Sequence, residues 1–189
     1  MPDDLHLVIR LKGGDEEAFA ELVNLYQKRI YTMLYQMTGN HFEADDLSQE
    51  AFLRAYKYIG SFKGTSSFQT WLYRIARNLA FTHLKRRKQK SALVLNEFPV
   101  ENLLESHKDN PMRLLMHKEL QSEITKAINS LPLLQREVAV LLLLQELSYK
   151  ETAEIQGCSE GTVAWRFYQA RRRLMKILGP SVNKMGYKK

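Results

Sequence analysis

Apolar side chains recur at steps of three and four residues along most of the chain, and no segment shows the sustained alternation that is typical of a half-buried strand. The longest helical pattern lies between Gly13-Gly14-Asp15 and Gly39-Asn40, where Asp15 is expected to cap the helix and Gly39 to end it. Its apolar positions are Phe19, Leu22, Val23, Tyr26, Ile30, Met33, Leu34 and Met37. The pattern therefore predicts an all-α fold with a long amphipathic helix near its start.

A second helix is predicted over about 42–58, and its two sides differ in character. The inner side carries Ala44, Leu47, Ala51 and Ala55. The outer side carries Glu43, Asp46 and Glu50 at i, i+3 and i+7, with Asp45 and Gln49 beside them. Carboxylates at this spacing can bind a metal or act as acid and base, but no histidine joins them. Two interpretations stay open: solvated negative charge that the helix dipole favours, or a docking face for a basic protein partner.

A third helix is predicted to follow the loop 60–65, with Ser66 and Gln69 as its capping box. Its inner side carries Phe68, Leu72, Ile75, Ala76 and Leu79, and a neighbouring side carries Trp71, Arg74, Asn78, Thr82 and Lys85. The run Lys85-Arg86-Arg87-Lys88-Gln89-Lys90 closes the segment. Cations, an amide and aromatic rings beside a loop suit single-stranded or distorted DNA. For Trp71 alone the pattern favours a place in the core, whereas for the basic run it favours phosphate contact over a solvated tail.

Periodicity is lost from about residue 89 to residue 110, where Pro and Asn residues gather, and it returns near Pro111. The second periodic part begins with a helix through Leu114, Leu115, Leu120, Ile124, Ala127 and Ile128. A corner at Leu131-Pro132 and a strongly apolar helix over 136–145 follow, and the polar tail after Gly179-Pro180 is expected to fray. The chain is thus predicted to hold two helical domains, 13–90 and 111–179, joined by a flexible linker over 91–110.

The segment from Ser148 to Leu174 has the signals of a helix-turn-helix. Ala153 is small enough for the helix crossing, Gly157 can adopt a positive φ, and Val163 anchors the second helix. Ser148 with Glu151 is expected to form a capping box on the first helix, and Ser159 to cap the second.

The second helix of this motif is basic on one side. It is predicted to bury Val163, Phe167, Ala170 and Leu174, and to turn outward Thr162, Trp165, Arg166, Gln169, Arg172 and Arg173. Guanidinium groups suit guanine edges or phosphates, and Gln suits adenine, so this face is a candidate reader of the major groove. The alternative is a solvated basic helix that packs on its own domain. A helix-turn-helix by itself does not say which kind of DNA-binding protein carries it.

Composition narrows the function classes. The 189 residues carry a formal net charge of +7, which favours an anionic partner, and the clustering of the basic residues favours nucleic acid over membrane. The single cysteine, Cys158, excludes an internal disulfide and suits a reducing cytosol. No apolar run is long enough to span a bilayer and no signal peptide is visible, so we expect a cytoplasmic protein. Without ligand spacing among the histidines, a phosphate-binding glycine loop or a nucleophile with a base, we expect no enzyme, metal site, cofactor or small-molecule substrate.

Three segments together resemble the extracytoplasmic-function sigma factors of bacterial RNA polymerase. They are DEEAFAELVNLYQKRIYTMLYQMTGNHFEADDLSQEAFLRAYKYIGSF, FQTWLYRIARN with its basic run, and SLPLLQREVAVLLLLQELSYKETAEIQGCSEGTVAWRFYQARRRL. The resemblance covers nearly the whole chain except the linker and the termini. It implies a helical domain for the promoter minus-10 element, a linker, and a helical domain for the minus-35 element.

The resemblance also implies roles for individual residues. Asp45, Asp46, Gln49 and Glu50 match the segment that docks on the clamp helices of core polymerase. Asn78 and the loop from Lys63 to Ser67 match the pocket for a minus-10 base turned out of the stack, and Trp71, Arg74 and Arg77 lie on the matching helix. Thr162, Arg166 and Arg171 match the minus-35 reading helix, although the chain departs from the family pattern at Ala164, Trp165, Tyr168 and Gln169.

The resemblance further implies control by an anti-sigma factor, often membrane-bound, and a stress or envelope response. A repressor or activator that binds a duplex operator without polymerase is the alternative, but it would need dimerisation and a palindromic site. Co-purification with polymerase separates the two hypotheses.

Overall fold

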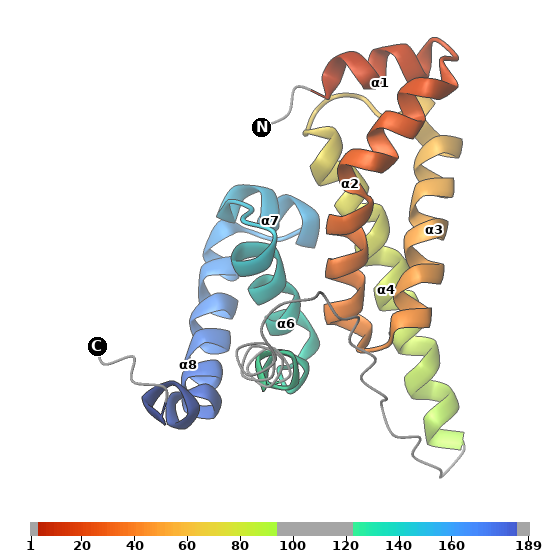
Figure 1. Cartoon of the computed structure of the whole chain (residues 1–189). Coiled ribbons are helices and arrows are strands. Elements are labelled where there is room, and N and C mark those ends of the chain that lie inside the picture. Colours follow the sequence, from red (N-terminus) through yellow and green to blue (C-terminus); the bar gives the residue numbers. More distant parts are fainter. Residues whose placement is uncertain (1–3, 94–122, 185–189) are drawn as a thin grey trace, which may run out of the picture. The chain divides into compact units, whose positions relative to one another are not determined.

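The structure is a computed structural model that describes residues 4–93 and 123–184. Every regular element in these two ranges is helical, so the predicted all-α fold is confirmed (Figure 1). The chain divides into two compact units, the first built on α1 to α4 and the second on α6, α8 and most of α7. None of the described helices is both long and apolar enough to cross a membrane.

The first unit is a bundle whose centre is α2 (Glu16–Thr38), packed against α3 (His41–Tyr58) and α4 (Phe68–Leu93). Asp15 caps α2 as predicted, because its Oδ1 accepts hydrogen bonds from the backbone N–H groups of Glu17 at 3.0 Å and Ala18 at 3.3 Å. Gly39 ends the helix with a φ of 72°. The residues of α2 that are completely buried include Leu22, Ile30, Met33, Leu34 and Met37.

A short helix that the periodicity did not predict, α1 (Leu5–Lys12), precedes α2 and packs against it. Leu7, Val8 and Leu11 are buried on one side of α1. The Tyr26 hydroxyl of α2 donates a hydrogen bond to the carboxylate of Asp4, just before α1. This helix therefore belongs to the hydrophobic core of the first unit.

The helix α4 begins at Phe68 as predicted, but its capping residue and its last residue differ from the prediction. Ser67, and not Ser66, caps the helix: its Oγ accepts a hydrogen bond from the Thr70 N–H at 3.1 Å, whereas Gln69 is buried, so the predicted Ser66–Gln69 capping box is wrong. At the other end, α4 continues through the basic run to Leu93, because Lys, Arg and Gln are good helix formers. The 3₁₀ turn η1 (Ile59–Ser61) lies between α3 and the loop that leads to α4.

In the second unit, residues 123–129 are helical and are followed by α6 (Leu133–Ala139), the π-helical turn η2 (Val140–Leu144), α7 (Tyr149–Gln156) and α8 (Glu160–Lys184). Ala127 and Ile128 are buried as predicted; the earlier part of their predicted helix and most of the predicted linker lie outside the described residues. The helix α8 continues through Gly179 and Pro180, so the predicted fraying after these residues is wrong for 181–184. The helix continues although proline at an interior position usually kinks or breaks a helix.

The helix-turn-helix forms as predicted. Ser148 and Glu151 form the capping box, with the Ser148 N–H 2.8 Å from Glu151 Oε2 and the Glu151 N–H 3.2 Å from Ser148 Oγ. Ser159 Oγ accepts from the Thr162 N–H at 3.2 Å and so caps α8. The small Ala153 packs with Val138 and Val163 in one core cluster, and Ala170 packs with Leu131 and Ala139 in another. These contacts fix which side of α8 faces outward.

Candidate functional site

The acidic residues of α3 separate into two groups. Asp45 and Asp46 are exposed, and Gln49 donates a hydrogen bond to Asp45 Oδ2 at 3.0 Å. Glu50 forms an ion pair with Arg54 one turn further on, at 2.7 Å. We call Asp45, Asp46, Gln49 and Glu50 the acidic face. It presents concentrated negative charge on a chain whose net charge is positive.

Glu43 belongs to the second group because it holds α3 to α4. Its Oε2 lies 2.9 Å from Arg87 Nη1 and 3.1 Å from His83 Nε2. Arg87 also donates to the carbonyl oxygen of Thr38 at 3.1 Å. The structure therefore separates Glu43 from the acidic face and places Arg87, a predicted phosphate contact, in an ion pair within the first unit.

An open groove of about 630 Å³ runs between α2 and α3. Its lining from α2 is Phe19, Val23, Gln27, Lys28 and Tyr31, and its lining from α3 is Asp45, Ser48, Gln49, Phe52 and Leu53. Two residues of the acidic face thus border an apolar surface. Phe19 and Val23 were predicted as core positions, but both are only half-buried, since the pattern shows that a side chain is apolar and not whether another helix covers it.

Aromatic rings gather where the loop 62–67 meets α4. The ring centroids of Phe62 and Trp71 lie 5.3 Å apart, and those of Phe68 and Trp71 lie 5.8 Å apart. Phe62 and Phe68 are buried, whereas Trp71 is half-buried and so lies at the margin of the core. In the loop between Phe62 and Phe68, Lys63 and Ser67 are exposed, and Ser67 caps α4.

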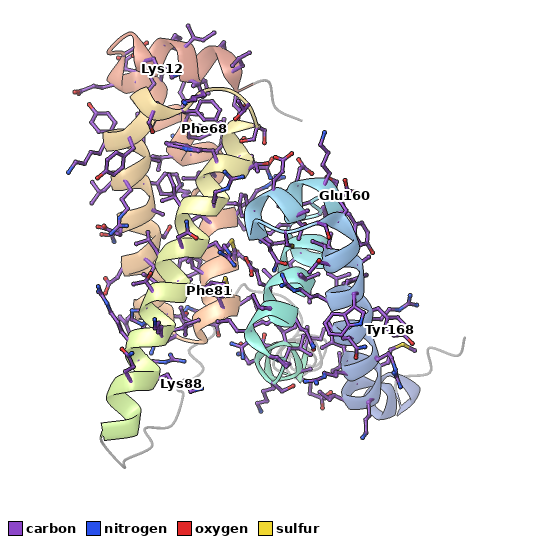
Figure 2. All side chains as sticks on the ribbon, turned by 180° about the vertical axis from the view of Figure 1, so that it is seen from behind. Lys12, Phe68, Phe81, Lys88, Glu160 and Tyr168 are labelled. Atoms are coloured by element: carbon purple, nitrogen blue, oxygen red, sulfur yellow. The ribbon has the colours of Figure 1, made fainter. Side chains whose placement is uncertain are left out.

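Polar side chains follow one another along α4, whose course can be traced in Figure 2 by the labelled residues Phe81 and Lys88. Arg74 and Asn78 are exposed one helical turn apart. Arg77 donates to the side-chain oxygen of Asn78 at 3.3 Å, and its guanidinium group lies 4.3 Å from the centre of the Phe81 ring. Lys85 and Arg86 are exposed further along. Tyr73 of the same helix is completely buried, and this burial raises the pKa of its hydroxyl, which therefore remains neutral.

The outer side of α8 combines aromatic and basic side chains (Figure 2). Trp165 is 60% exposed and Tyr168 56% exposed, and the guanidinium group of Arg172 lies 5.8 Å from the centre of the Tyr168 ring. Arg171 and Arg173 are exposed as well.

Three of the predicted outward residues of α8 are less exposed than Trp165 and Tyr168. Thr162, Arg166 and Gln169 are half-buried, with Thr162 Oγ1 2.9 Å from Ser159 Oγ and Arg166 Nη1 3.6 Å from Cys158 Sγ. The predicted outward positions are therefore all at least partly exposed. Within the described residues, no group of three or more His, Cys, Asp or Glu side chains is arranged to hold a metal ion.

Two family models match the chain, one within the first unit and the other largely within the second. The model for Sigma-70 region 2 matches residues 22–90, and the model for Sigma-70, region 4 matches residues 121–174. The chain is 38% identical to the ECF RNA polymerase sigma factor SigW of Bacillus subtilis, over 89% of this chain and 93% of that protein. It is 36% identical to the RNA polymerase sigma-H factor of Pseudomonas aeruginosa, over 94% of each chain, and 35% identical to the ECF RNA polymerase sigma-E factor of Escherichia coli K12, over 96% of this chain and 97% of that one.

Solved structures agree with the fold. The sigma factor RpoE from Bartonella quintana, in complex with the anti-sigma factor NepR, matches with a TM-score of 0.72 at 25% identity, covering 85% of this chain and 96% of that chain. CnrH in complex with the cytosolic domain of CnrY matches with a TM-score of 0.68 at 21% identity, covering 94% of this chain and 97% of that chain.

Proposed function

Because the chain belongs to the extracytoplasmic-function sigma factors of RNA polymerase, we propose that it docks on core polymerase through α3 and directs initiation by placing two DNA-reading surfaces on one promoter. It works in the cytoplasm beside the polymerase and performs no catalytic step of its own. The observation that carries this proposal is the separation of charge: the acidic face lies on α3, while the cationic and aromatic surfaces lie on α4 and α8.

The acidic face binds the clamp helices of the polymerase. Asp45 and Asp46 are exposed, and Asp45 and Gln49 border the groove between α2 and α3. A helix laid along this border would bury apolar side chains against Phe52 and Leu53 while its basic side chains met the carboxylates. Docking thus combines apolar burial with charge complementarity.

The minus-10 element is read by the start of α4 and the loop before it. The loop from Lys63 to Ser67 and the exposed amide of Asn78 accept a base turned out of the stack. The half-buried ring of Trp71 and the side chains of Arg74 and Arg77 lie on the same helix as Asn78 and belong to this minus-10 surface. Lys85 and Arg86 contact backbone phosphates, while Arg87 acts mainly by holding α4 to α3.

The minus-35 element is read in duplex form by α8, whose N-terminus is placed by the helix-turn-helix. Thr162, Trp165, Arg166 and Gln169 approach base edges, and Arg171, Arg172 and Arg173 neutralise phosphates. Each contact is modest, but two contacts on one tethered chain raise the effective concentration of each other.

An anti-sigma factor is the proposed regulator. A structural relative is solved with an anti-sigma factor, and a protein that covered the acidic face or the DNA-reading surfaces would keep this chain inactive until a stress or envelope signal released it.

Transcription from purified core polymerase tests the proposal. The wild-type chain should produce promoter-dependent transcripts from a genomic library, and their absence from every template would reject the function. Asn78→Ala should weaken discrimination of minus-10 bases and leave polymerase binding intact, with Asn24→Ala, the same substitution at an exposed position of α2, as control. Asp46→Lys should weaken polymerase binding, with Glu17→Lys as a control of equal charge change at an exposed position of α2. Equal loss of both activities in either test variant would contradict the assignment, as would tight binding of a duplex operator by a dimer without polymerase.

A further inference from the structure

We propose that Lys12, the last residue of α1, is a positioning residue for the loop that reads the minus-10 element. The inference rests on the proposed function and adds to it a residue outside the matched region 2, which begins at residue 22. Figure 2 shows Lys12 and Phe68 at the same end of the first unit.

Lys12 contacts the residue from which the loop departs. Its Nζ donates a hydrogen bond of 2.5 Å to the carbonyl oxygen of Phe62 and lies 5.5 Å from the centre of the Phe62 ring. A charged donor gives a stronger hydrogen bond than a neutral one, and the ring face adds a cation–π attraction. These two contacts join positions that are 50 residues apart in sequence.

Lys12 is itself held in place by the junction of α1 and α2. The N–H of Gly13 donates to the carbonyl of Arg10 at 2.9 Å, and the N–H of Asp15 donates to the same carbonyl at 3.1 Å. The Arg10 side chain lies 2.8 Å from Asp15 and 3.0 Å from Glu21, and its hydrogen bond lowers the pKa of the Asp15 carboxyl. With Leu11 buried as well, the end of α1 forms a rigid base for the lysine.

Phe62 transmits this constraint to the loop. Its ring is buried against Phe68 and Trp71, and its N–H donates to the Ile59 carbonyl at 3.1 Å. Because a peptide unit is planar, fixing the Phe62 carbonyl also fixes the N–H of the next residue and the direction in which the loop starts. At its other end the loop is fixed by Ser67, the cap of α4. Lys12 therefore helps set the path of the five residues from Lys63 to Ser67.

A direct phosphate contact by Lys12 would have a different signature. Removing a phosphate contact weakens binding about equally for all sequences and lowers its dependence on salt. Loosening the loop instead lowers the preference for the correct minus-10 base and leaves the salt dependence unchanged. The two roles can be told apart in one set of measurements.

The experiment uses the full chain with core polymerase. Transcript yields are compared between a promoter and versions of it with each minus-10 base substituted, at several salt concentrations. Lys12→Met should lower discrimination at one or two minus-10 bases by about fivefold, which corresponds to the usual net contribution of one hydrogen bond. Polymerase affinity and salt dependence should not change. Lys57→Met is the matched control, because Lys57 is also an exposed lysine of this unit that lies over a ring, 5.6 Å from the centre of Tyr58.

The other variants make the result decisive. Lys12→Arg keeps a cationic donor and should retain most of the discrimination, whereas Lys12→Gln should behave like Lys12→Met; circular dichroism checks that each variant is folded. The inference is overturned if Asn78→Ala changes discrimination and Lys12→Met and Lys12→Gln do not, or if these two variants lose yield uniformly with a weaker salt dependence. A wild-type chain that gives no promoter-dependent transcript would instead overturn the proposed function, and this inference with it.

Discussion

The turn of the helix-turn-helix depends on Gly157, and replacing it by alanine gives a quantitative test of the fold. Gly157 has a φ of 65°, in the left-handed region, and separates α7 from α8. A Cβ built at this position would meet no atom within 4 Å. The substitution Gly157→Ala therefore introduces backbone strain without a steric clash.

The expected cost follows from these two facts. An L-residue other than glycine loses about 1–2 kcal/mol in the left-handed region. Alanine also restricts the unfolded chain, which returns about 0.4–1 kcal/mol of stability. The net loss should be about 1 kcal/mol, which corresponds to a fall of roughly 4–8 °C in the melting temperature of a helical unit of this size. Gly157→Asn should cost less, because asparagine tolerates positive φ better than alanine.

Gly161 supplies the matched control, four residues away in the first turn of α8. Its φ is not positive, and a Cβ there would lie 3.9 Å from Ser159 Oγ, which is an ordinary contact. Gly161→Ala should therefore stabilise the unit by up to about 1 kcal/mol. A glycine-to-alanine substitution is thus predicted to lower stability at position 157 and to raise it at position 161. Thermal and urea unfolding, followed by circular dichroism, measure both.

The affinity for DNA should not change in parallel with the stability of the variants Gly157→Ala and Gly161→Ala. A loss of about 1 kcal/mol leaves a domain of ordinary stability predominantly folded near 25 °C, so binding of a minus-35 duplex by the polymerase complex should be nearly unchanged in Gly157→Ala. If both alanine variants change the melting temperature in the same direction, the argument from the positive φ is wrong.

Two further predictions concern ion pairs of the first unit. A double-mutant cycle of Glu43→Gln with Arg87→Met should give a coupling of about 0.5 kcal/mol, as is usual for partly exposed pairs; a coupling of zero would show that the pair does not hold α3 to α4. The hydrogen bond from Arg10 lowers the pKa of Asp15, so the pair stabilises the fold above the ordinary pKa of aspartate, which is about 4, and this stabilisation is lost as the pH falls through the lowered pKa. The urea midpoint of Asp15→Asn, which keeps a capping side chain, should therefore fall less than that of the wild type between about pH 7 and pH 3; equal falls would contradict the linkage.

Local signals in the sequence were sufficient for the caps and the turn of the helix-turn-helix, although they misplaced the cap of α4 by one residue. The Ser148–Glu151 box, the Ser159 cap and the positive φ of Gly157 each involve residues within a few positions of one another. Their hydrogen bonds are set by backbone geometry that the local sequence already determines. The helix-turn-helix and the outward side of α8 could be predicted for this reason.

Signals that depend on distant residues were not visible. The eight residues of α1 make about two helical turns, too few for a periodic pattern, and their burial depends on contacts with α2. The hydrogen bond from Lys12 to the Phe62 carbonyl joins residues that are 50 positions apart. The end of α8 was misplaced for another reason, because a Gly-Pro pair does not always stop a helix.

The division of the acidic residues shows why tertiary contacts decide which charges are available to a partner. Glu43 and Asp46 stand three positions apart, about 60° around the helix, and appear equivalent in sequence. The structure turns Glu43 toward Arg87 on α4 and leaves Asp46 exposed. Arg54 balances part of the charge of Glu50 through its ion pair. The negative field offered to a basic partner therefore centres on Asp45 and Asp46, beside the apolar groove, and is narrower than the sequence alone suggests.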